Sequence, residues 1–348
     1  MQAYRFEKGE GAIQRRTLPI PQPTADQVLI TVKAAGLCHS DLHILHGGLE
    51  DSGPFAVHPP LTLGHEVAGV ISSVGPGVTS FKLGDRVSVA QIGYPVEETS
   101  WDTAVGLGCD GGLAEYVVAH VRHVVRVPDN VPLHLAAVAT DAVSTAYHAV
   151  VTEAEAGPGK NIAIVGLGGL GLNGVVSASL QGASVYGFDI DTKRFEAAKK
   201  SGAIACYQSL DEMSDGFFDA IVDFAGVGKT TALAIKRVKV CGVVVLIGLG
   251  VNEATLPTSL LTMKSIHLKG SMGASLQEYQ RILEHIETGE IVPVTEEIPF
   301  DDVSGGLDRL AAGNVSGRLW TDPSAIRQAW NTQVDARLTP APTPFLYR

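Results

Sequence analysis

The sequence predicts a two-domain α/β protein, in which a β-rich domain is joined to a doubly wound parallel sheet. The chain has 348 residues, which is more than one hydrophobic core usually fills. Its first 148 residues contain short β-branched runs separated by Gly, Pro and Asp. Near residue 160 the pattern changes to an apolar strand, a glycine turn, a helix and a second strand, which is the order of a βαβ unit.

In residues 1–148 the expected strands are QVLITVKAAGL, HEVAGVISSVG, DRVSVA and LAEYVVA, and they predict a barrel or sandwich. Residues 149–274 are expected to form the parallel sheet, with strands in NIAIV, SVYGFD, DAIVDFAG and GVVVLIGLG and a helix in TTALAIKRVKV. The stretch SLQEYQRILEHIETGEI then has helical spacing. We expect residues 275–348 to complete the first domain, and the Pro-rich stretch after Asp322 has no predicted role.

Composition excludes several classes of partner. The chain has 26 basic and 37 acidic residues, a net charge of -11, and no block of Lys and Arg, which disfavours nucleic acid and anionic membranes. Its four cysteines form no CxxC pair, which suits a reducing compartment. The N-terminus lacks the apolar segment of a signal peptide, and the longest apolar run is too short to span a bilayer. We therefore expect a soluble, cytoplasmic protein.

The glycine turn GLGGLG predicts a dinucleotide site. Its glycines, which follow a strand and open a helix, let the backbone approach a pyrophosphate at the helix N-terminus; they are Gly166, Gly168, Gly169 and Gly171. Asp189 ends the next strand, where a carboxylate would accept hydrogen bonds from ribose hydroxyls and repel a 2′-phosphate. NAD is therefore favoured over NADP, although Lys193 and Arg194 lie close enough to soften that preference.

The heptapeptide LCHSDLH, residues 37–43, gathers four groups capable of chemistry: Cys38, Ser40, Asp41 and His43. Alone it is ambiguous. Ser40 or Asp41 could cap a helix that follows, His43 could be a surface histidine, and Cys38 could be a buried thiol.

Several motifs together resemble one family. AAGLCHSDLH, GHEVAGVI, LGDRV, GGLAEYV, GLGGLG and a closing Gly-Arg pair make the chain, to about Arg318, similar to the zinc-dependent alcohol dehydrogenases of the medium-chain dehydrogenase/reductase group. The resemblance implies a GroES-like catalytic domain and a Rossmann domain that binds NAD. It also implies a small-molecule alcohol or carbonyl substrate and a homodimer or homotetramer.

The resemblance implies one catalytic zinc. Cys38 and His65 match two of the family's ligands, and thiolate and imidazole are donors that zinc prefers. The family usually has a cysteine as third ligand, where this chain has Asp141, a harder donor that leaves the net charge of the site unchanged. Glu66 is either a fourth, exchangeable ligand or a carboxylate behind the ligands. The family's structural zinc needs four cysteines in a lobe that here holds only Cys109, so we expect no structural zinc.

The resemblance also divides the work of the other residues. Ser40 would take the proton of the alcohol and pass it through the ribose to His43, which suits a relay to solvent. Asp41 would hold the outer nitrogen of His65. The remaining matched residues are expected at the cofactor: Thr145 and Leu170 pack around the nicotinamide, and Arg318 pairs with the pyrophosphate.

Three hypotheses follow. The first is an NAD-dependent alcohol dehydrogenase, or carbonyl reductase in the reverse direction, in which zinc polarises the alcohol and hydride passes to NAD. The second is a zinc-free reductase of activated C=C or iminium bonds, in which Asp141 marks a lost metal site. The third is a non-catalytic NAD-binding protein. The presence of Ser40 and His43 beside Cys38 and His65 favours the first.

Overall fold

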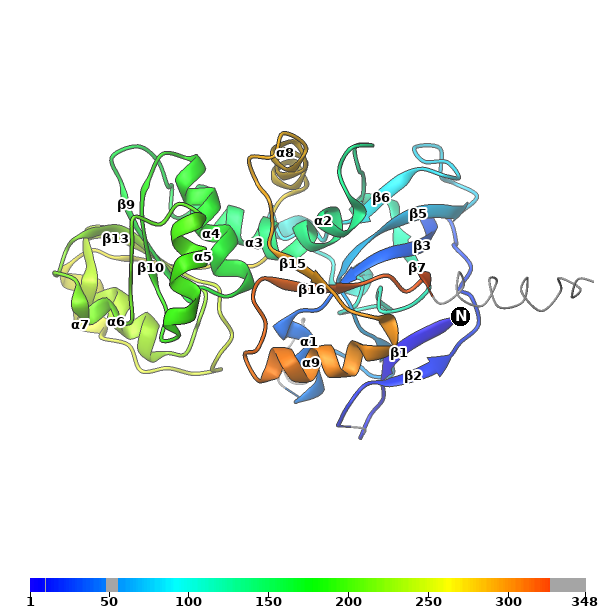
Figure 1. The fold of residues 1–348 in the computed structure, drawn as a ribbon, viewed down its shortest axis with the longest axis horizontal. Coiled ribbons are helices and arrows are strands. Elements are labelled where there is room, and N and C mark those ends of the chain that lie inside the picture. Colours follow the sequence, from blue (N-terminus) through cyan, green and yellow to red (C-terminus); the bar gives the residue numbers. More distant parts are fainter. Residues whose placement is uncertain (10, 48–55, 326–348) are drawn as a thin grey trace, which may run out of the picture.

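The computed structural model describes residues 1–9, 11–47 and 56–325, which form two lobes lying side by side (Figure 1). One lobe is built on a parallel sheet and the other is rich in antiparallel strands. The segment GGLEDSGPFAVHPP lies partly, and the Pro-rich stretch after Asp322 mostly, outside the described residues. Within these residues, no helix combines the length and apolar character needed to cross a bilayer.

The first lobe contains a six-stranded parallel sheet with the strand order β11-β10-β9-β12-β13-β14. In chain order its strands are β9 (Asn161–Val165), β10 (Ser184–Phe188), β11 (Ala205–Tyr207), β12 (Phe218–Asp223), β13 (Val238–Leu246) and β14 (His267–Gly270). Its helices are α4 (Gly169–Leu180), α5 (Phe195–Lys200), α6 (Lys229–Arg237) and α7 (Thr258–Met263). The order reverses between β9 and β12, which is where such sheets bind ligands. The predicted doubly wound sheet is confirmed.

Two details of this lobe differ from the prediction. The predicted helix TTALAIKRVKV ends at Arg237, and its last three residues begin β13, because the β-branched Val238 takes an extended backbone with ψ of 153°. Strands β11 and β14 were not predicted. Neither is a buried apolar run: the β14 sequence HLKG is mostly exposed.

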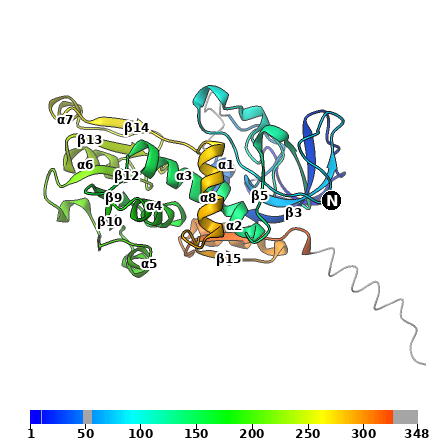
Figure 2. The ribbon, with the colours of Figure 1, turned by 90° about the horizontal axis from the view of Figure 1, so that it is seen from above.

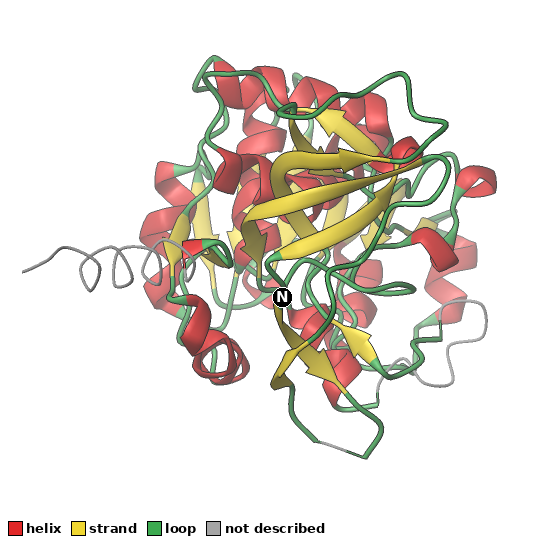
Figure 3. Ribbon diagram, turned by 90° about the vertical axis from the view of Figure 1, so that its right-hand side faces the viewer, coloured by secondary structure: helices red, strands yellow, loops and turns green. Residues whose placement is uncertain are grey.

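The second lobe has a seven-stranded sheet in the order β15-β16-β3-β5-β6-β8, with β7 also paired to β3, and a small sheet in the order β2-β1-β4. The strands are β1 (Gln2–Phe6), β2 (Gln14–Thr17), β3 (Gln27–Gly36), β4 (Leu61–Thr62), β5 (Glu66–Val74), β6 (Arg86–Val89), β7 (Tyr116–His120), β8 (Val124–Arg126), β15 (Thr295–Glu297) and β16 (Arg318–Thr321). Figure 3 views this lobe end-on, with its curved strands in front. The four predicted strand runs correspond to β3, β5, β6 and β7.

The chain returns to this lobe near its C-terminus, because β16 pairs antiparallel with β3. Helix α9 (Val303–Ala311) precedes β16 and buries Val303, Leu307 and Leu310 in the core of the same lobe. The exact domain limits, residues 148/149 and 274/275, stay a prediction.

The structure also contains several short helical elements. They are helix α1 (His39–Leu45) and the 3-10 turns Val96–Glu98, Trp101–Thr103, Val121–His123, Thr192–Arg194, Leu210–Glu212 and Phe300–Asp302.

A long helical segment runs between the lobes and was not predicted. It comprises α2 (Leu133–Val138), the π-helical η5 (Ala139–Val143), α3 (Ser144–Tyr147) and the π-helical η6 (His148–Glu153). Most of its side chains are buried, so the sequence has no polar face from which helical periodicity could be read. Its path matters because η5 carries Asp141.

Helix α8 (Leu276–Glu287) lies across this segment, between the two lobes (Figure 2). A capping box formed by Ser275 and Glu278 starts the helix. Its buried face includes Tyr279, whose hydroxyl is hydrogen-bonded with Ser88 Oγ at 2.7 Å and with Ala136 O at 2.9 Å. One helix therefore ties β6 and α2 together.

Candidate active site

The heptapeptide LCHSDLH forms the start of α1. Cys38 is the N-cap, and its backbone N–H donates to Asp41 Oδ2 at 2.9 Å. The turn is fixed from behind, because Leu37 N–H donates to Leu319 O in β16 at 2.9 Å. Cys38 and Asp41 are both almost fully buried. Helix capping and a functional site thus use the same residues.

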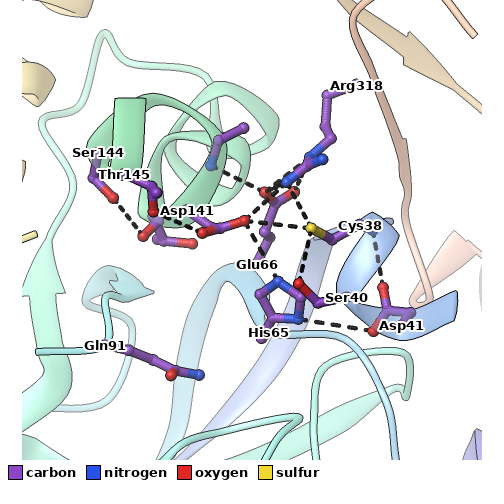
Figure 4. Close-up of polar contacts among 12 residues, drawn as sticks. Cys38, Ser40, Asp41, His65, Glu66, Gln91, Asp141, Ser144, Thr145 and Arg318 are labelled. Carbon is purple, nitrogen blue, oxygen red and sulfur yellow. Dashed lines mark hydrogen bonds and ion pairs between the residues drawn. The ribbon is translucent and has the colours of Figure 1, made fainter. Parts of the chain in front are cut away.

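Three potential metal ligands converge here from separate elements (Figure 4). Cys38 starts α1, His65 immediately precedes β5, and Asp141 lies in η5; their donor atoms all lie within 4.8 Å of one another. Asp141 Oδ2 lies 3.5 Å from Cys38 Sγ and 3.5 Å from His65 Nε2. Ligands bonded to a tetrahedral zinc at about 2.0–2.3 Å are separated by about 3.3–3.8 Å. The thiolate, imidazole and carboxylate therefore fit one zinc ion.

The electrostatics of this cluster favour a cation at its centre. Burial alone would lower the pKa of His65, but the Cys38 thiolate and the carboxylates of Asp141 and Asp41 raise it well above its ordinary value. Burial alone would likewise raise the pKa of Asp141, yet its contacts with His65 and Arg318 hold it well below its ordinary range. Anions that stabilise an imidazolium would also stabilise a metal ion placed among them.

His65 presents its two ring nitrogens to different carboxylates. Nε2 faces Asp141, whereas Nδ1 lies 3.7 Å from Asp41 Oδ1. Both Nδ1 and this Oδ1 are buried without a hydrogen-bond partner among the residues that the structure describes, so a small approach of the two would satisfy both atoms. The arrangement fits an imidazole that gives Nε2 to a metal and keeps its proton on Nδ1 toward Asp41.

Two of the predicted site residues touch the cluster through their hydroxyls. Ser40 Oγ lies 3.5 Å from Cys38 Sγ. Thr145, one turn beyond Asp141, donates from Oγ1 to Asp141 Oδ1 at 2.8 Å. Thr145 therefore also orients the Asp141 carboxylate. The sequence predicted Thr145 beside the nicotinamide and did not predict this contact. His43 lies further along α1, half-buried, and burial and the nearby His46 lower its pKa.

Arg318 and Glu66 form a buried ion pair beside the cluster (Figure 4). Arg318 Nη2 donates to Glu66 Oε1 at 2.6 Å, to Asp141 Oδ2 at 2.9 Å and to Cys38 Sγ at 3.1 Å. Burial raises the pKa of Glu66, and Arg318 opposes that rise. Glu66 is not among the three clustered donors. The sequence linked Arg318 to the cofactor and did not predict its contacts with the ligands.

The glycine turn lies at the carboxyl end of β9, where the sheet order reverses. Gly166 has a φ of 85°, which favours glycine, and a Cβ on Gly171 would lie 1.7 Å from Gly166 O. Leu170 is the second residue of α4 and is half-buried. A Cβ on Gly169 would lie 3.7 Å from Arg318 Nη1, so the arginine borders both the glycine turn and the ligand cluster.

Asp189 lies beside this turn. Its Oδ2 accepts from Leu167 N–H at 2.7 Å and from Arg194 Nη1 at 3.4 Å, and its Oδ1 accepts from Asp191 N–H at 2.9 Å. A Cβ on Gly168 would lie 3.4 Å from the same Arg194 nitrogen. Asp189 thus borders the glycine turn, as a ribose-binding carboxylate requires.

His39 belongs to the same region, although the sequence motifs assign it no role. Burial and the positive charges of Arg318, His43 and Arg194 lower its pKa. These three groups therefore act electrostatically on the same region as His39. Its position between Cys38 and Ser40 was the one sequence feature that pointed to the site. The sequence alone does not show which way a histidine on a short helix points.

The loop region around Cys109, between β6 and β7, packs closely against the backbone near Gly64. A Cβ on Gly106 would lie 2.4 Å from Gly64 O, and one on Gly111 would lie 2.5 Å from the same oxygen. Asp110 Oδ1 accepts from Thr62 N–H at 2.8 Å and from Arg5 Nη1 at 2.9 Å. Burial raises the pKa of Cys109 to about 11.

Comparison with known proteins agrees with this geometry. Residues 24–129 match the alcohol dehydrogenase GroES-like domain, and residues 169–288 match the zinc-binding dehydrogenase domain. The chain is 31% identical to an alcohol dehydrogenase of Geobacillus stearothermophilus, over 92% of this chain and 98% of that protein. It is 29% identical to an NAD-dependent alcohol dehydrogenase of Sulfurisphaera tokodaii, over 91% and 99%.

A solved structure is also similar. The acetophenone reductase of Geotrichum candidum, in complex with NAD, superimposes with a TM-score of 0.84 at 31% identity, covering 92% of this chain and 96% of that one. The predicted GroES-like and Rossmann architecture and the resemblance read from the sequence motifs are confirmed.

Proposed function

Because this chain belongs to the zinc-dependent alcohol dehydrogenase family, we propose that it works through one catalytic zinc held by Cys38, His65 and Asp141. The chain is an NAD-dependent oxidoreductase that interconverts an alcohol with an aldehyde or ketone. The observation that carries the metal proposal is the pair of 3.5 Å separations from Asp141 Oδ2 to Sγ and Nε2. When bound, zinc acts as a Lewis acid on the substrate oxygen, and NAD accepts or returns the hydride.

Asp141 takes the place of the family's usual cysteine, and its surroundings favour an ionised carboxylate. Thr145 donates to Oδ1, and Arg318 donates to Oδ2. These contacts fix the carboxylate so that Oδ2 faces Cys38 and His65. This is the behaviour of a retained ligand rather than a lost site, and it weakens the alternative of a zinc-free reductase. Asp41 would orient His65 from the other side.

The proton route begins at Ser40. Its hydroxyl is next to Cys38 Sγ and is therefore close enough to receive the proton of an alcohol at the ligand cluster. His43 follows one turn later on α1 and would pass the proton to solvent. Its lowered pKa keeps the imidazole neutral, and ready to accept, down to lower pH than an exposed histidine.

The cofactor would lie along the glycine turn, with its pyrophosphate at the N-terminus of α4 and its ribose hydroxyls at Asp189. Arg194 and Arg318 border this turn, and their guanidinium groups would supply positive charge for the pyrophosphate. We propose Leu170 and Thr145 as residues next to the nicotinamide. The preference for NAD over NADP rests on Asp189.

We propose that the chain holds one catalytic zinc and no structural zinc. A structural zinc would need four cysteines in the loop region after β6, and only Cys109 lies there. The raised pKa of Cys109 disfavours the thiolate that zinc requires. The packing of Gly106 and Gly111 on Gly64 holds that loop region by other means.

We also propose a homo-oligomer, dimer or tetramer. Strand β14 pairs with β13 on one side and ends the path of the sheet on the other. Large apolar side chains near it are exposed: Leu268, Met272 and Leu249. An unpaired strand edge flanked by apolar side chains favours pairing with a second copy. Light scattering after size-exclusion chromatography measures this directly, and a monomer at all concentrations would contradict it.

Metal content and activity together test the proposed function. Wild type and Asp141→Ala are purified with zinc supplied and measured by elemental mass spectrometry, and NADH formation is followed with a panel of alcohols. About one zinc per wild-type chain is expected. The variant should lose most of it together with alcohol oxidation. A zinc-free wild type that reduces activated C=C bonds would instead support the alternative reductase.

A further inference from the structure

We propose that Arg318 is a positioning residue that holds the Glu66 carboxylate away from the metal and so keeps one coordination position open for substrate. The inference deepens the proposed function and rests on it. It also answers a question that the sequence left open, namely whether Glu66 is a ligand or a carboxylate behind the ligands.

Both oxygens of Glu66 are occupied by Arg318. Nε donates to Oε1 at 2.9 Å and to Oε2 at 3.0 Å, and Nη2 donates to Oε1 at 2.6 Å. The two side chains are 3% and 0% exposed, so water does not screen the pair. The backbone N–H of Ala142 adds a bond to Oε1 at 3.2 Å. A planar guanidinium that binds a carboxylate through two nitrogens fixes its direction as well as its charge.

Glu66 is nevertheless close to the ligands. The Nη2 atom that binds Oε1 also binds Asp141 Oδ2 at 2.9 Å and Cys38 Sγ at 3.1 Å. A single nitrogen therefore separates Glu66 from two of the three clustered donors. A Cβ on Gly36 would lie 1.9 Å from Glu66 Oε2, so the carboxylate occupies space that only glycine at position 36 leaves free. The fold thus provides a seat for Glu66 beside the cluster.

The charges at the site explain why the buried position of the Glu66 carboxylate requires Arg318. When ionised, Cys38, Asp141 and Glu66 carry three formal negative charges around Arg318, and a divalent metal ion with one guanidinium balances them. A further buried carboxylate, Asp41, lies at the other nitrogen of His65. Without the guanidinium, Glu66 would be a buried carboxylate with one backbone N–H as its partner. Such a group is strongly destabilised. The nearest remaining positive charge would be the metal, and a carboxylate that reached it would fill the fourth position.

Cobalt substitution gives a readout that does not depend on turnover. Co2+ replaces zinc in wild type, Arg318→Gln, Glu66→Gln and the double variant, and binding of imidazole is followed in the visible spectrum. Imidazole is chosen because it is neutral above its own pKa, so that loss of the Arg318 charge does not itself weaken binding. The cobalt-substituted Arg318→Gln variant should bind imidazole about tenfold or more weakly than the wild type does, which corresponds to about 1.4 kcal/mol.

The double variant is the decisive control. Because it lacks the carboxylate, its imidazole affinity should return to that of wild type, and Glu66→Gln alone should resemble wild type. Arg318→Lys keeps the charge without the fork and should show a smaller loss, which preserves the test if Arg318→Gln does not fold. Wild-type affinity in Arg318→Gln, or no recovery in the double variant, overturns the inference. A wild type that takes up no cobalt would overturn the metal site as well, so the two failures are distinguishable.

Discussion

Thr145 Oγ1 donates a 2.8 Å hydrogen bond to Asp141 Oδ1, one helical turn earlier, while the other carboxylate oxygen faces Cys38 and His65. The third ligand position is therefore supported from within its own helix.

Thr145→Val should weaken metal retention by about tenfold, because it removes the hydroxyl that fixes Asp141 and keeps a similar shape. Competition between the protein and a zinc chelator measures the change. Thr145→Ser keeps the hydroxyl and should retain most of the affinity. Equal retention in the Val and Ser variants would show that this bond does not support the ligand.

Asp189→Gly should raise the KM for NAD by about tenfold and reduce the preference for NAD over NADP, because it removes the proposed ribose-binding carboxylate and one of the two carboxylates that pair with Arg194. Initial rates with both cofactors measure the change. Asp191→Asn, a neighbouring change that leaves Asp189 in place, is the control. Unchanged cofactor selectivity in Asp189→Gly would mean that another group recognises the ribose.

His43→Ala should slow alcohol oxidation by about tenfold, and more strongly at about pH 6 than at about pH 9, because proton release to solvent is hardest at low pH. The pKa of His43 is lowered by burial and by His46, so the wild-type relay should remain active below the ordinary histidine range. The pH profile of kcat/KM measures this, with His267→Ala, on the exposed strand β14, as the control. A parallel fall at every pH would remove His43 from the relay.

His123 should make the fold sensitive to acid. Burial and the charges of Arg122 and His120 lower its pKa to about 4. Between about pH 4 and 6.5 the unfolded chain binds more protons than the folded one, so the free energy of unfolding falls as pH falls across that window. The loss is at most about 3 kcal/mol.

His123→Gln should flatten this dependence while offering Thr103 a polar partner in place of Nε2, which lies 2.8 Å from the Thr103 hydroxyl. Denaturant unfolding at several pH values measures the slope. His267→Gln, on the exposed strand β14, controls for the loss of one histidine. If the slope is as steep in His123→Gln as in wild type, other groups cause the acid sensitivity.

The candidate site was predictable where local motifs carry it. Cys38 and His65 each lie in a short recognisable segment, and Asp141 was found because it stands where the family usually has a cysteine. Arg318 was found as well, but its contacts were not. They depend on β16 pairing with β3 across the whole chain, and such long-range pairing leaves no local pattern in either segment.

The fold followed the same rule. The buried strand β9 and the glycine turn have strong local patterns, and both were predicted. The helical segment from Leu133 to Glu153 was missed because burial on nearly every side removes the periodicity that identifies a helix. Strand β14 was missed because its residues are too polar and exposed to resemble a buried strand.

The π-helical winding of Ala139–Val143 has a consequence for how this site can change over evolution. A π-helical turn holds about one residue more than an α-helical turn, so deletion of a single residue in this segment would restore α-helical winding and move the residues of the turn relative to the flanking helices. Asp141 would no longer face Cys38 and His65, although its chemical identity would be unchanged. The third ligand is therefore specified by residue count as well as residue type. An alignment that scores only the residue at position 141 would miss its loss.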